Sequence, residues 1–132
     1  MIFELPEELP LDEAIFDDGV DPKAKEKQLE HQLDKLDYAD VEIVIGGEPH
    51  KSAALFEKRE YPAVLTFLRG KRDPNADACN DLGCAQAWKH DWAKAKASLE
   101  RSKEEAGQEL EKAVRAERNL AVAAKAKEVA ES

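Results

Sequence analysis

The sequence predicts an all-α protein made of short helical hairpins, and three observations carry this prediction. Apolar residues recur at spacings of three and four over much of the chain, which is the period of an amphipathic helix. Most prolines and glycines fall between these periodic segments. Residues 108–131 are rich in Ala, Glu and Lys and contain neither breaker, which favours one long helix. At 132 residues we expect one domain with a small core.

Charge and hydropathy exclude several classes of protein. The chain has 20 basic and 29 acidic residues, a net charge of -9, which argues against nucleic-acid binding through a broad basic surface. No apolar run approaches the roughly 20 residues of a membrane span. The opening residues show neither the basic nor the apolar region of a signal peptide. We therefore expect a cytoplasmic protein with neither a nucleic-acid nor a membrane partner.

The acidic residues are concentrated at the N-terminus. Residues 1–50 carry 15 acidic and 4 basic side chains, a net of -11, whereas residues 51–132 carry 14 and 16, a net of +2. Residues 1–20 alone hold seven carboxylates and no basic residue, with apolar side chains between them. This pattern predicts a flexible acidic arm over 1–20, which either orders on a partner or docks a few residues on its own body.

The first element of the body, over residues 21–132, is a predicted helix at about 22–38. Asp21 suits the N-cap, Pro22 suits the first helical position, and three leucines recur on one face. The β-branched segment that follows, 41–45, is interpreted either as a short strand or as a buried turn of helix. Gly46, Gly47 and Pro49 end it in both cases.

Two helical hairpins are predicted next, at about 48–69 and 76–106. In the first, Pro62 suits the first turn of a second helix, which requires a tight turn near 58–60. In the second, Asp91 is placed to cap a helix over about 92–106, and Gly107 to end it. The long helix over about 108–131 completes the chain.

Residues that carry catalysis or bind metals do not form a recognisable pattern. Cys79 and Cys84 are five apart, about 140° around a helix, so we expect reduced, apolar cysteines rather than a disulfide. The histidines are scattered, and none has zinc-site or catalytic spacing to the cysteines. We expect neither an enzyme nor a cofactor or metal site.

The two predicted hairpins resemble each other and a known family. Val64 and Ala95 follow equivalent turns 31 residues apart, close to the 34-residue period of tetratricopeptide repeats. The segment Asn80-Asp81-Leu82-Gly83-Cys84-Ala85, continued by Trp92, Ala95 and Leu99, resembles that family's pattern. The resemblance implies a right-handed solenoid in which Gly83 and Ala95 leave room for close helix packing. The helices at 22–38 and 108–131 are then candidate caps, the latter through an apolar seam of Leu110, Ala113, Leu120 and Val129.

The family resemblance also implies a function. Such repeats serve as protein–protein interaction modules, scaffolds or adaptor-like and chaperone-like proteins, and bind a peptide or partner helix in a concave groove. Carried over by helical phase, the peptide-binding positions are Asp77, Asn80, Cys84, Ala87, Trp88, Arg115, Arg118, Val122 and Lys125.

Two further expectations concern how this groove is used. The amide of Asn80 is expected to hold a peptide backbone, and the cations to meet carboxylates. These carboxylates include those of the acidic arm, which is expected to dock on this groove in the same chain. The alternative function is an acidic effector or inhibitor that acts through the arm on a basic partner.

Overall fold

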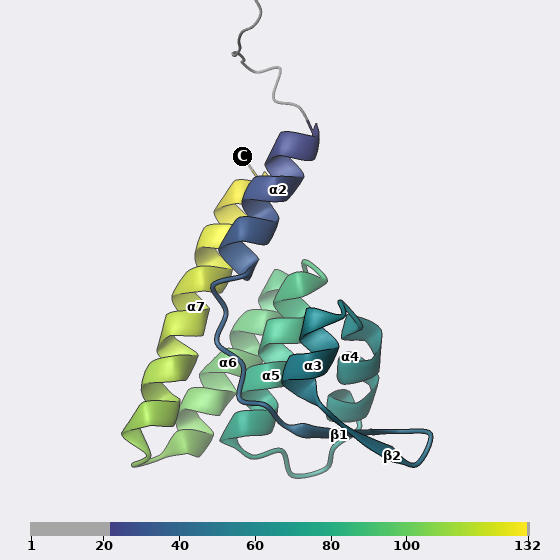
Figure 1. Cartoon of the computed structure of the whole chain (residues 1–132). Coiled ribbons are helices and arrows are strands. Elements are labelled where there is room, and N and C mark those ends of the chain that lie inside the picture. The colour runs from purple at the N-terminus through teal and green to yellow at the C-terminus, as the bar shows by residue number, and fades with distance from the viewer. Residues whose placement is uncertain (1–21, 132) are drawn as a thin grey trace, which may run out of the picture.

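A computed structural model describes residues 22–131 of the chain (Figure 1). Most of these residues are helical, which confirms the predicted helical class. The expected acidic arm lies outside the described residues. The elements are α2 (Pro22–Leu33), β1 (Glu42–Ile45), β2 (Glu48–Lys51), α3 (Ser52–Glu57), α4 (Tyr61–Arg69), α5 (Ala76–Trp88), α6 (Trp92–Ala106) and α7 (Leu110–Glu131).

The β-branched segment forms a strand, so the first of its two interpretations is right. β1 pairs antiparallel with β2, in a register that places Glu42 opposite Lys51. Gly46 and Gly47 form the two-residue turn with φ values of 57° and 84°, a conformation that glycine adopts without a steric penalty. The helical hairpin predicted from residue 48 therefore begins at Ser52 instead, because the glycines fold the chain back as a strand.

The first helix is shorter than predicted. α2 ends at Leu33 rather than near 38, and residues 36–41, here called the strap, cross the other helices as an extended segment (Figure 1). The predicted leucine face is buried throughout, including Leu36 on the strap. The helix stops because side chains from other helices bind the strap's backbone amides, a competition that the local sequence does not reveal.

The two helix–turn–helix units contain the same turn. Glu60 N–H donates to the Leu55 carbonyl, and Asp91 N–H donates to the Gln86 carbonyl, both at 2.9 Å and each spanning five residues. Before these positions, Arg59 and His90 adopt left-handed conformations with φ of 61° and 63°. This is the Schellman arrangement that ends a helix, repeated after 31 residues. The internal repeat suggested by the sequence spacing is therefore present in the backbone.

The α5–α6 pair packs as closely as the small residues predicted. A Cβ on Gly83 would lie 2.6 Å from Cγ of Leu99 and 3.2 Å from the Ala95 carbonyl oxygen, so no larger residue fits without movement. Ala95 and Leu99 are completely buried. Ser102, one turn later, donates a 2.7 Å hydrogen bond to the Ala76 carbonyl and joins the far ends of the two helices.

The two candidate caps pack against each other. In Figure 1, α2 runs alongside the C-terminal part of α7, which projects beyond the end of α6. α7 begins at Leu110, and its buried stripe is Ala116, Asn119, Ala123 and Ala126. The predicted seam is wrong for Leu110, whose side chain is 73 % exposed. No helix among the described residues is long and apolar enough to span a membrane.

Candidate functional site on the concave face

The strap is held by a buried cluster of polar side chains. Four members of this cluster, one from α3, two from α5 and one from α7, are completely buried: Ser52, Asn80, Asp81 and Asn119. Buried polar groups destabilise a protein unless they are hydrogen-bonded. In this cluster the main-chain atoms of the strap complete the hydrogen bonds.

Two asparagines bind one peptide unit of the strap from two different helices. The side-chain amide of Asn119 donates to the Asp37 carbonyl at 2.9 Å, and its oxygen accepts from Asp37 N–H at 2.9 Å. Asn80 donates to the same carbonyl at 3.0 Å. Asn119 also donates to Oδ1 of Asn80 at 2.7 Å, which fixes the orientation of both amides. The expectation that Asn80 holds an extended backbone is realised within the chain itself.

Asp81 and Ser52 hold the next part of the strap. Oδ1 of Asp81 accepts from Ala39 N–H at 2.6 Å, and Oγ of Ser52 accepts from Val41 N–H at 2.6 Å. The Ser52 hydroxyl in turn donates to Oδ2 of Asp81. Burial raises the pKa of the Asp81 carboxyl, and these hydrogen bonds only partly oppose the shift.

Aromatic side chains anchor the middle of the strap. The ring of Tyr38 stacks on Phe56 with 3.9 Å between centroids, and the indole N–H of Trp88 donates to the Tyr38 hydroxyl at 2.9 Å. Trp88 stacks in turn on Tyr61 at 5.0 Å. Of the strap's contacts described here, only those of Leu36 and Tyr38 use side chains of the strap.

The nine predicted peptide-binding residues fall into two groups. Asn80, Cys84 and Ala87 are completely buried and Trp88 nearly so, since the strap and its neighbours cover them. They do not line an open groove, and this part of the prediction is corrected. Asp77, Arg115 and Val122 are half-buried, while Arg118 and Lys125 are exposed.

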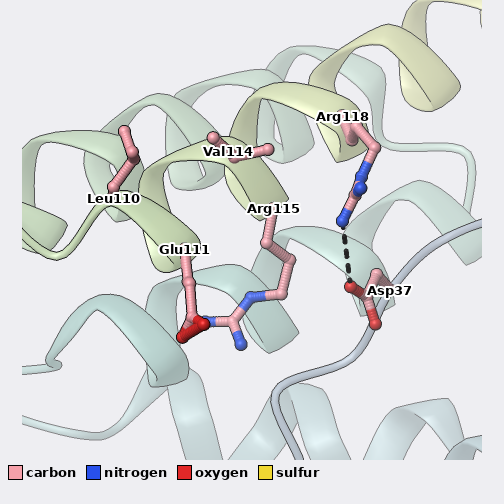
Figure 2. Close-up of a pocket in the computed structure, with 6 residues that line it drawn as sticks. All are labelled: Asp37, Leu110, Glu111, Val114, Arg115 and Arg118. Carbon is pink, nitrogen blue, oxygen red and sulfur yellow. Dashed lines mark ion pairs between the residues drawn. The ribbon is translucent and has the colours of Figure 1, made fainter.

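The exposed group borders an open hollow beside the strap (Figure 2). Figure 2 shows Arg115 and Arg118 extending from the same side of α7, with Arg118 directed toward Asp37 of the strap. The Arg118–Asp37 ion pair measures 3.6 Å, and Arg115 pairs with Asp77 of α5 at 2.6 Å. The hollow has a volume of about 440 Å³, and its lining is Asp37, Leu110, Glu111, Val114, Arg115 and Arg118. We call it the strap hollow.

The polar groups of this region have few features of a catalytic centre. Within residues 22–131, no cluster of three His, Cys, Asp or Glu side chains is arranged to hold a metal ion. Burial raises the pKa of both the Cys79 and the Cys84 thiol, which disfavours the reactive thiolate form. The arrangement instead provides hydrogen bonds and ion pairs that can bind a peptide.

The sequence interpretation missed three residues that hold the strap: Ser52, Asp81 and Asn119. The phase carried over from Leu120 selected Arg118, whereas the structure places Asn119 opposite Asn80. A signal was available, because Asn119 is a polar residue within the otherwise small and apolar stripe of α7. Comparisons with family models, with curated proteins and with solved structures found no match to this chain.

Proposed function

We propose that the protein is a protein–protein interaction module that binds an extended peptide on its concave face. One observation carries the proposal: side chains from three helices bind the strap through its main-chain atoms at Asp37, Ala39 and Val41. Recognition of main-chain atoms does not depend on the identity of the bound side chains. A surface with this chemistry suits peptides in general, and the strap is its occupant within the chain.

The partner is placed in the strap hollow, which continues from the bound end of the strap along α7. Leu110 and Val114 are 73 % and 41 % exposed there, and they offer apolar contact area to a ligand. Arg118 extends over the same hollow from an exposed position, so a carboxylate of the ligand can compete with Asp37 for its guanidinium. We therefore expect a peptide that combines apolar and acidic residues.

Selection of random displayed peptides on the full chain tests this function. Enriched peptides are synthesised, and their dissociation constants are measured by fluorescence anisotropy. Val114→Asp is expected to raise the dissociation constant about tenfold or more, because a loss of ~1.4 kcal/mol in binding corresponds to that factor. Val44→Asp is the matched control, since Val44 is 42 % exposed on β1, away from the strap hollow. Equal effects of the two substitutions would contradict the proposal.

The alternative, an acidic effector, is favoured by the distribution of charge. Residues 22–131 carry 21 acidic and 20 basic side chains, so the other eight of the 29 carboxylates lie in residues 1–21. Changing these eight residues to their amides separates the two functions. The interaction module keeps its affinity for the selected peptides, whereas an effector acting through the arm loses its capture of a basic partner.

A further inference from the structure

A second groove lies between α6 and α7 and shares no lining residue with the strap hollow. It has a volume of about 510 Å³. Trp92 and Leu120 form apolar walls, and the small side chains of Ala93, Ala123 and Ala124 leave the space between them. An apolar groove between two helices is the shape into which further apolar side chains pack.

Two lysines border this groove. Lys96 extends from α6 and Lys127 from α7, and both are exposed. Among residues 22–131 neither lysine has an ion-pair partner, whereas Arg115, Arg118 and Lys125 each have one. Glu100 is the one carboxylate in the lining, so the groove combines an apolar floor with an excess of positive charge. The complementary ligand is therefore apolar and acidic.

The chain itself contains such a ligand. Residues 11–18 supply Leu11, Ile15 and Phe16 within six positions, together with four carboxylates and no basic residue. The described part of α2 begins at Pro22, and Lys27 of α2 lines a hollow together with Val129 of α7. The arm therefore joins the body beside the end of α7.

The distances permit the contact. Six residues separate Phe16 from Pro22, and an extended chain spans about 3.3–3.6 Å per residue, or roughly 20 Å in all. Leu120 lies nine residues before Val129 on α7, which is about 14 Å along a helix. We propose that residues 11–18 bind the α6–α7 groove of the same chain, with Ile15 and Phe16 on its apolar floor and the carboxylates beside Lys96 and Lys127.

This site differs from the one that the sequence alone suggested for the arm. The cations of that face, Arg115, Arg118 and Lys125, are paired with Asp77, Asp37 and Glu128, and the strap occupies the adjoining surface. The α6–α7 groove offers unpaired lysines. A short connection to α7 also gives the arm a high effective concentration, about millimolar for short flexible linkers.

A spin label on the full chain tests the proposal. Ala14→Cys places the label between Leu11 and Ile15, and the buried Cys79 and Cys84 do not compete for it. Amide signals of Ala93, Lys96 and Ala124 are expected to broaden by paramagnetic relaxation, more strongly than those of α4. The double variant Lys96→Glu/Lys127→Glu is expected to restore these signals. Its charge-matched control, Lys51→Glu/Lys58→Glu, changes exposed lysines elsewhere and is expected to leave the broadening intact.

A mixed sample distinguishes the possible occupants. Spin-labelled chains without ¹⁵N are added to ¹⁵N-labelled chains without a spin label, so that only contacts between chains broaden the signals. Broadening of the groove signals in this sample would assign the groove to the arm of a second copy and overturn the intrachain proposal. Broadening centred elsewhere, or broadening that persists both in the charge-reversed variant and in Ile15→Ser/Phe16→Ser, would also overturn it. The Val114 experiment concerns another surface, so failure of either proposal leaves the other standing.

Discussion

Helices α5 and α7 both contribute an asparagine to the buried cluster, yet they differ in how much of their surface is covered. Eleven of the 13 residues of α5 are buried, because α4, α6 and the strap surround it. Only four of the 22 residues of α7 are buried, in a narrow stripe that faces α2, α5 and α6. A helix packed on several sides constrains almost every residue, whereas a helix packed along one stripe constrains few.

This difference explains where the sequence interpretation worked. Around α5 the close approach of Gly83 to Leu99 restricts residue size, and the resulting pattern of small and large residues can be read directly. On α7 alanines occupy both the buried stripe and exposed positions, so the helical phase is ambiguous by one residue. That one residue is the difference between Arg118 and Asn119.

The largest effect that tests this comparison comes from truncating matched leucines. Leu99 is completely buried against Gly83, so Leu99→Ala removes core contacts and leaves a cavity. We expect it to lower the free energy of unfolding by about 2–5 kcal/mol. Leu110→Ala on exposed α7 should change it by no more than about 0.5 kcal/mol. Urea denaturation of both variants measures the contrast, and similar losses would show that α7 is as constrained as α5.

Overpacking the α5–α6 contact is the second test. Ala95→Leu introduces three carbon atoms at a completely buried position beside Gly83, and such substitutions cost about 1–3 kcal/mol. The melting temperature should fall accordingly. Ala97→Leu, at an exposed position two residues along α6, is the control and should leave the melting temperature nearly unchanged. An unaltered melting temperature in Ala95→Leu would contradict the proposed register of the repeat.

The third test separates the neighbouring residues on α7. Asn119→Ala removes both side-chain partners that α7 gives to Asp37 of the strap, and each group left buried without a partner costs about 1–3 kcal/mol. Arg118→Ala removes an exposed ion pair, which is worth no more than about 1 kcal/mol. Hydrogen exchange at Ala39 and Val41 should accelerate in Asn119→Ala alone. Equal exchange in the two variants would remove Asn119 from its role in holding the strap.

The smallest effect concerns pH. Burial raises the pKa of Asp81 in the folded protein, so the stability that wild type has relative to Asp81→Asn is fully present below the unfolded pKa, near 3.9. This relative stability is lost as pH rises through the raised folded pKa. Urea denaturation of both proteins from pH 3.5 upward (a range that brackets about 3.9) measures the difference. A constant difference across the series would show that the Asp81 carboxyl is not shifted by its burial.

The sequence by itself determined the helical class, the internal repeat with its tight turns, and the close contact at Gly83 and Ala95. Each of these depends on local spacing or on residue size, and both are visible in one sequence. It did not determine where α2 ends, because Leu33 is followed by residues that a helix tolerates. The tertiary structure decided that end.

The candidate site depended still more on tertiary structure. Asn80 was identified from the sequence as a residue that binds a peptide backbone, but its ligand, the strap, was not. Asp37 and Asn119 are 82 residues apart, and Ala39 and Asp81 are 42 apart, so no local pattern records their contacts. The strap stays extended because buried side chains must form hydrogen bonds, and the backbone of residues 37–41 supplies the missing partners.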